Sequence, residues 1–195
     1  MSKSDPSAAK KERNKTIRWV VTIFFTTILI SGFISLLSDE IMSRSGMAVA
    51  FLILLAIILI GILFDVIGVA VTSADEKPFH SMAARKVNGA QEAIRLLRNA
   101  ERVSSICNDV IGDICGVVSG SASATIAAQV LQNFAFSWPR MISLVMSALV
   151  AGLTVGGKAI GKTIAINSST GIVFGVGKVL YFFRHIGSVF HRKKK

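Results

Sequence analysis

The chain has 195 residues, of which 52% are hydrophobic, and it carries a formal net charge of +11. Its mean hydropathy of +0.61 exceeds that of an ordinary soluble domain, which the composition therefore excludes. The Lys and Arg residues cluster between apolar runs instead of forming one face of a soluble fold, which argues against a nucleic-acid-binding protein.

The N-terminal part of the chain holds a basic tail and the first span. Residues 1–18 are polar and rich in Lys and Arg, which predicts a disordered cytoplasmic tail. Residues 19–38 form an apolar run that is long enough to cross a bilayer, and no small-residue cleavage site follows it. We therefore expect an uncleaved transmembrane helix here and a second one over residues 47–74.

A basic stretch separates the second span from the third. Residues 75–102 contain six Lys and Arg side chains, so the positive-inside rule places them in the cytoplasm. Pro78 and the Asn88-Gly89 pair divide the stretch into two short helices, which we expect to lie on the membrane surface.

The second half of the chain predicts two more spans and an amphipathic end. The spans are expected over residues 103–131 and 141–166. Residues 172–195 place Lys178 and Tyr181 opposite an apolar face and end in a basic tail, which is typical of an interfacial helix. The expected fold is thus an all-α integral membrane protein with four transmembrane helices. We expect it to be multi-pass in the plasma (inner) membrane, with both termini in the cytoplasm.

Three acids lie inside the predicted spans and point to an ion site. They are Asp65, Asp109 and Asp113, and no acid follows Asp113. An unpaired charge at the bilayer centre costs about 2.5–3.5 kcal/mol on insertion scales, so these carboxylates require cations, protons or buried partners. Asp65 and Asp113 each lie ten residues from the cytoplasmic end of their spans, which predicts that they share one level.

Neutral oxygens near these acids complete a candidate site for a hard cation. Asp109 and Asp113 are four residues apart, so we expect one helix face to carry both. The expected metal ligands are Asp65, Asn108, Asp109 and Asp113, with the Ser73 hydroxyl and the Gly68 backbone as further oxygens. The alternative is that the acids are protonated or salt-bridged. Lys158 and Lys162 are the candidate counter-ions.

Two glycine strings lie in the third and fourth spans. Gly112, Gly116 and Gly120 form a doubled G-x-x-x-G, which predicts a close helix contact. Residues 156–163 (GGKAIGKT) fit the P-loop pattern letter for letter. They follow a run of helix length, and no acid for Mg²⁺ comes after them, so we expect packing glycines and no nucleotide site.

Five short motifs follow one another within residues 47–183. They are LFD at 63–65, AVTS at 70–73, NAERV at 99–103, ICND at 106–109 and GKAIGKTIA at 157–165. In this order the chain resembles the transmembrane module of the CorC/CNNM (CorB-like) magnesium-transport family. The resemblance implies a homodimer with three core spans, to which residues 19–38 are an addition. Asp65 and Lys158 depart from it, since the family usually has Ser and Glu there.

The sequence therefore predicts a transporter and not an enzyme. The expected substrate is Mg²⁺ or another divalent cation, with Na⁺ as the candidate coupling ion and no covalently bound cofactor. The expected partners are the lipid bilayer and a second copy of the chain. The alternative function is a non-transporting membrane scaffold or accessory subunit, whose buried acids are salt-bridged or protonated.

Overall fold

The structure, a computed structural model, describes residues 6–133 and 138–192. Within these ranges it is helical and has no strand, and four helical stretches are long and apolar enough to cross a membrane. The prediction of an all-helical protein with four helices able to span a membrane is therefore confirmed for the described residues. The elements are α1 (Pro6–Arg44), α2 (Met47–Ser73), α3 (Lys77–Ala84), α4 (Ala90–Arg98), α5 (Ala100–Ser105), the π-helical segment η1 (Ile106–Gly112), α6 (Asp113–Asn133), α7 (Pro139–Asn167) and α8 (Ser169–Arg192).

Helix α1 begins earlier than the sequence predicts. The prediction of a disordered tail over residues 1–18 is wrong from Pro6 onward, because the helix already begins there. Ala8, Ala9 and Glu12 are strong helix formers. The apolar part of the same helix supplies a nucleus, so extending it over these residues needs no new nucleation step. Residues 1–5 lie outside the described part.

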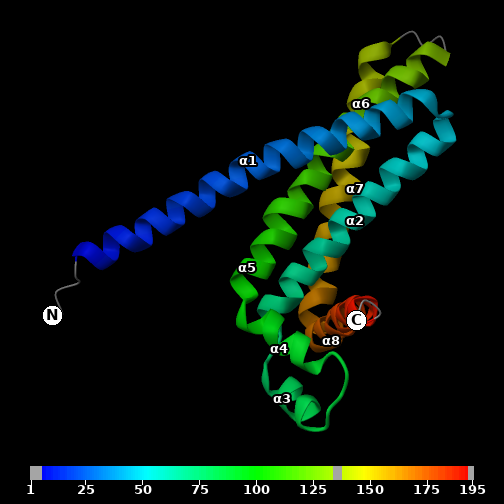
Figure 1. Cartoon of the computed structure of the whole chain (residues 1–195). Coiled ribbons are helices and arrows are strands. Elements are labelled where there is room, and N and C mark those ends of the chain that lie inside the picture. The colour runs from blue at the N-terminus through cyan, green and yellow to red at the C-terminus, as the bar shows by residue number, and fades with distance from the viewer. Residues whose placement is uncertain (1–5, 134–137, 193–195) are drawn as a thin grey trace.

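Helix α2 is the central element of the bundle. It contacts α5, η1, α6, α7 and α8, and Figure 1 shows it beside α7 along most of its length. Glycines allow these close approaches. A Cβ at Gly61 would lie 2.8 Å from the Cβ of Cys115 on α6, and one at Gly161 would lie 2.6 Å from a methyl group of Val66. Gly157 likewise faces Ile62. The glycines of the P-loop-like string therefore pack α7 against α2.

Two apolar clusters occupy opposite halves of the bundle. The first lies where α1, α2, α6 and α7 meet and contains Met42, Ala50, Leu54, Ile58, Ala122, Ile126 and Val150. The second lies where α2 and α7 meet α3, α4 and α8 and contains Ala70, Val71, Phe79, Ala93, Ala165 and Val173. The segment of α2 between the clusters carries Asp65, so an acid stands between two apolar layers.

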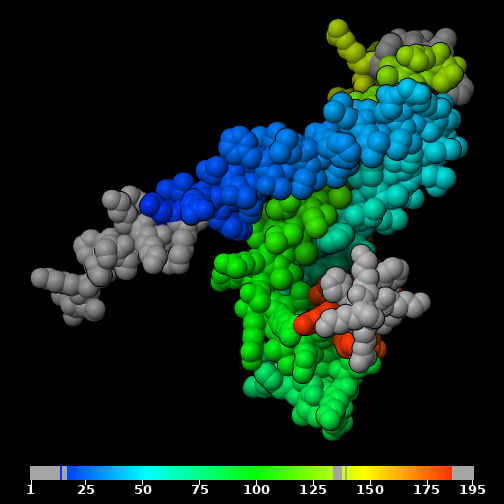
Figure 2. All heavy atoms as spheres, in the orientation of Figure 1, coloured from blue at the N-terminus to red at the C-terminus, as the bar shows by residue number. Residues whose placement is uncertain are grey.

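Helix α1 is attached to the bundle near its C-terminal end. The Thr125 hydroxyl donates a hydrogen bond to the Asp39 carboxylate at 3.1 Å, and the Gln129 amide donates one to the Met42 carbonyl at 2.8 Å. From there α1 crosses the face of the bundle obliquely, and its N-terminal part projects beyond the other helices (Figures 1 and 2). Most of its apolar side chains are exposed, which suits contact with lipid.

Helices α3 and α4 are the two short helices predicted between the second and third spans. They lie with α8 at the end of the bundle where α2 ends (Figure 1). Phe79 of α3 is fully buried in the second apolar cluster. Gly89 has φ +91° and lies directly on the backbone of α8, where a Cβ would be 2.7 Å from the Lys178 nitrogen. This glycine contact fixes the start of α4 against α8.

Candidate functional site

A cluster of three charged side chains joins three helices within the spans. The Lys158 ammonium of α7 lies 3.6 Å from the Asp65 Oδ1 of α2 and 3.8 Å from the Asp113 Oδ1 of α6. The alternative in which Lys158 pairs with the intramembrane acids is therefore what the structure shows. We call Asp65, Asp113 and Lys158 the charge cluster.

Asp65 and Lys158 can meet because they lie at a similar depth and because a glycine leaves space between them. Asp65 is eight residues from the end of α2 and Lys158 is nine from the end of α7, so both lie about 12–14 Å along their helices from that side. Gly112 lies between them. A Cβ there would be 3.3 Å from the Lys158 ammonium and 3.5 Å from the Asp65 carboxylate, so a larger residue would press on the ion pair.

The members of the cluster differ in exposure. The exposed fraction of the side chain is 17% for Asp65, 24% for Lys158 and 70% for Asp113. With one ammonium and two carboxylates, the ionised cluster has a net charge of −1. Inside a bilayer a residual charge is unfavourable, so the cluster retains a capacity for a further proton or cation.

The π-helical segment η1 separates Asp109 from the cluster. In an α-helix, residues four apart share a face, but a π-helix bonds i to i+5 and turns the following residues away from that register. Asp109 accepts a hydrogen bond from the Ser105 hydroxyl at 2.8 Å and lines a crevice beside Trp19 and Thr27 of α1. Asp109 and Asp113 therefore have different neighbours: Asp109 lies beside α1, and Asp113 lies beside Lys158 of α7.

Asn108 lies against Gly68. Its amide fills the space that a side chain on Gly68 would need, and its Nδ2 donates a hydrogen bond to the Ser104 hydroxyl at 3.2 Å. Its Oδ1 is buried and has no hydrogen-bond partner in the described part of the chain. Gly68 thus makes room for an amide oxygen that retains acceptor capacity one helical turn from Asp65.

Ser73 and Lys162 lie apart from the charge cluster. Ser73 is the last residue of α2 and is about 12 Å from Asp65 along the helix. Lys162 lies one turn beyond Lys158, is exposed, and forms no ion pair with a described carboxylate. The P-loop-like string, residues 156–163, is helical throughout, so its backbone N–H groups are not arranged as a phosphate-binding loop.

The predicted metal-ligand set is thus only partly brought together. Asp65 and Asp113 meet around Lys158, Asn108 is nearby on η1, and Asp109 and Ser73 point elsewhere. Among the described residues no group of three His, Cys, Asp or Glu side chains is placed to hold a metal ion. The sequence analysis did not predict η1, the π-helical segment in which Asp109 lies.

The doubled G-x-x-x-G of the third span divides into two parts. Gly112 is buried at the charge cluster, as the motif predicts for a helix contact. For Gly116 and Gly120, no atom of a neighbouring element in the described part of the chain lies within 4 Å of the position of a Cβ.

Comparison of the chain with protein-family models, with curated proteins and with solved structures finds no match. The resemblance to the CorC/CNNM family therefore stays a prediction from the motifs.

Removing the Lys158 ammonium should destabilise the metal-free protein. We expect Lys158→Met to lower the free energy of unfolding by about 2–3 kcal/mol, because it leaves Asp65 without its counter-ion. Adding Asp65→Asn should recover most of this loss, since the two residues act as a pair. Unfolding by SDS in mixed micelles with a chelator present measures both effects. Lys162→Met is the control and should change the value by less than about 0.5 kcal/mol. Equal losses for the two lysine variants would contradict the pairing.

Proposed function

We propose that the chain transports a divalent cation across the membrane, with Asp65 and Asp113 as its carboxylate ligands and Lys158 as an internal competitor for the same position. The observation that carries this proposal is the ammonium held between carboxylates of two other helices within the spans. A cation that leaves water needs such a replacement for its hydration shell, and carboxylate oxygens suit hard cations.

Charge balance favours a divalent ion as the competitor. With Lys158 in place the ionised cluster has a charge of −1, and with a divalent cation in its place the two carboxylates are neutralised. Lys158 has a flexible four-carbon stem, so its ammonium can swing out of the position between the carboxylates when the metal binds. The protein then alternates between two states, one with the ammonium and a net charge of −1, and one with the metal and no net charge.

The segment η1 supplies a further oxygen next to this position. The unpaired Asn108 Oδ1 is a neutral ligand of the kind that Mg²⁺ accepts. Single π-helical turns inside α-helices are frequent at functional sites, because the extra residue re-aims side chains at a small energetic cost. The resemblance to the CorC/CNNM family supports Mg²⁺ as the substrate and Na⁺ as the coupling ion. It supports neither an enzymatic reaction nor a bound cofactor.

A membrane scaffold or accessory subunit is the second candidate function. The same ion pairs favour it, since Lys158 already compensates the acids without a metal. In that case the cluster only fixes the mutual position of α2, α6 and α7. The two functions differ in whether a metal ever replaces the ammonium.

Metal uptake by proteoliposomes distinguishes them. We expect the purified protein to admit Mg²⁺ to liposomes that contain a Mg²⁺-sensitive dye. Asp65→Asn and Asp113→Asn should each reduce the rate by at least about tenfold, because each removes a charged ligand. Glu101→Gln is the control, since Glu101 is an exposed acid of α5, and it should retain the wild-type rate. A Na⁺ gradient of opposite direction should accelerate uptake if Na⁺ is the coupling ion.

Asp109→Asn tests the orientation that η1 imposes. Because Asp109 faces α1 and not Lys158, this variant should keep most of the wild-type rate.

Wild-type uptake no faster than that of protein-free liposomes would favour the scaffold and end the transport proposal.

The proposed orientation places the termini and the helices α3 and α4 on the cytoplasmic side of a plasma membrane. Six basic residues lie between α2 and the end of the α5 helix, whereas the connection between α1 and α2 carries few. In a variant without Cys107 and Cys115, an impermeant maleimide added to intact cells should label Ser43→Cys and leave Ser81→Cys unlabelled. Both serines are exposed in the structure, so the side of the membrane on which each lies decides whether it is labelled. Labelling of Ser81→Cys from outside would reverse the orientation.

A second copy of the chain is proposed to cover one face of α6. Small residues with few or no neighbours occur at every fourth position along this face of the helix. They begin one helical turn after Asp113. They are Gly116, Gly120, Ala124 and Ala128. Such small-residue stripes allow helices to approach closely in membranes. In a monomer the largely exposed Asp113 carboxylate would face lipid, which is unfavourable, and a symmetric partner would cover it.

Cysteine cross-linking tests this dimer. In the same cysteine-free background, Ala124→Cys should form an intermolecular disulfide in membranes under mild oxidation. Leu153→Cys, on the exposed face of α7, is the control and should stay monomeric. A cross-link at residue 153 in place of 124 would move the interface to α7.

A further inference from the structure

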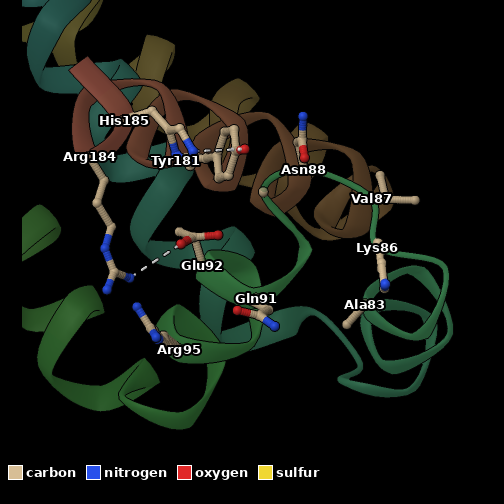
Figure 3. A pocket seen from close by; sticks show the side chains of 11 residues that line it. Ala83, Lys86, Val87, Asn88, Gln91, Glu92, Arg95, Tyr181, Arg184 and His185 are labelled. Carbon is tan, nitrogen blue, oxygen red and sulfur yellow. Dashed lines mark hydrogen bonds and ion pairs between the residues drawn. The ribbon is translucent and has the colours of Figure 1, made fainter. Parts of the chain in front are cut away.

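A basic pocket lies at the end of the bundle where α4 and α8 meet, away from the charge cluster. It has a volume of about 420 Å³ and lies between α4, α8 and the turn that joins α3 to α4 (Figure 3). Pockets of this size hold small ligands or parts of larger ones. Its lining includes Lys86, Arg95, Tyr181, Arg184 and His185.

Positive charge dominates the pocket. Lys86, Arg95 and Arg184 supply three cations, and Glu92 is the carboxylate among the lining residues. Glu92 is engaged with Arg184, whose Nη1 lies 3.5 Å from its Oε1. No ion pair with a described carboxylate compensates Lys86 or Arg95. Figure 3 shows the Arg95 and Arg184 side chains close to Glu92 on the same side of the pocket. The excess of cations calls for an anionic ligand.

The backbone holds this arrangement in place. Lys86 has φ +56°, a left-handed conformation that is rare for a residue with a side chain, and its N–H donates to the Ala83 carbonyl at 2.9 Å. Three residues later, Gly89 is fixed on the backbone of α8 beside Gly177. Lys86 is therefore presented by a defined turn and not by a flexible loop.

The chemistry of the pocket suits phosphate. Arg guanidinium groups bind phosphate oxygens with two parallel hydrogen bonds, and Lys adds a point charge. The Tyr181 hydroxyl lies 3.4 Å from the His185 Nε2 and adds a polar group on the α8 side.

The position of the pocket favours a lipid as the source of that phosphate. Helix α8 also carries exposed Val179, Phe182 and Phe183, which is typical of a helix lying in the membrane interface. A pocket on the polar side of such a helix is at headgroup level, and basic pockets at the ends of membrane helices bind anionic headgroups.

We propose that this pocket binds the phosphate group of an anionic phospholipid headgroup, with Arg95 and Arg184 as its contacts and Lys86, which Figure 3 shows across the pocket, as a more distant positive charge. The site is separate from the charge cluster, so the inference does not depend on the transport proposal.

Thermal unfolding of the purified full-length protein in detergent tests this inference. Dioctanoyl phosphatidic acid should raise Tm in a saturable way, whereas dioctanoyl phosphatidylcholine should not. Arg95→Gln should weaken the apparent affinity by at least about tenfold, because it removes a charge-assisted contact. Arg95→Lys should restore part of it. Arg98→Gln is the matched control, since Arg98 lies on the same helix but pairs with Glu76.

The readout is the lipid concentration at half-maximal stabilisation, so a change in the starting Tm of a variant does not affect it. Equal weakening by Arg98→Gln would show diffuse charge attraction and overturn the site. Inorganic phosphate or glycerol 3-phosphate that stabilises as well as the lipid, with the same dependence on Arg95, would identify a soluble anion and overturn the lipid assignment. Absence of any effect of phosphatidic acid would also overturn it.

Discussion

The Lys158 ammonium lies between the carboxylates of Asp65 and Asp113, and the arrangement of three spanning helices depends on this contact. Each charge alone is unfavourable in a bilayer, so the mutual compensation of these charges favours the packing of α2, α6 and α7 against one another. The contact is also directional, because it fixes which face of each helix points inward. Apolar packing alone would specify these faces poorly, since lipid is as apolar as the helices.

The neighbouring residues are arranged around this contact. Gly157 and Gly161 bring α7 close to α2, and Gly112 leaves space beside the ammonium. Apolar clusters lie on both sides of it along the bundle. They exclude water and so strengthen the electrostatic interactions between them. A cluster of this kind can hold helices together, and its net charge of −1 leaves one negative charge without a partner.

Much of the fold could be predicted from the sequence, and part of the site could not. Span positions follow from long apolar runs, and the common level of Asp65 and Asp113 follows from counting residues at 1.5 Å each. Lys158 was identifiable as a counter-ion because it is a charge within a span. The π-helical turn at η1 has no local sequence pattern, since it depends on how the third span packs on α2. Asp109 lies in this segment and beside α1, which the α-helical spacing did not predict. The helical start of α1 at Pro6 was missed because polar composition alone does not exclude propagation from an adjacent span.

The proposed competition between the Lys158 ammonium and a metal ion can be measured as Mn²⁺ binding by electron paramagnetic resonance. Mn²⁺ is a divalent ion that accepts the same oxygen ligands as Mg²⁺. Lys158→Met removes the competitor but keeps both carboxylates. If the two cations share one position, this variant should bind Mn²⁺ at least about tenfold more tightly than the wild type, a difference of about 1.4 kcal/mol. Adding Asp65→Asn should abolish the gain. Unchanged or weaker Mn²⁺ binding by Lys158→Met would contradict the account and leave the cluster a purely structural ion pair.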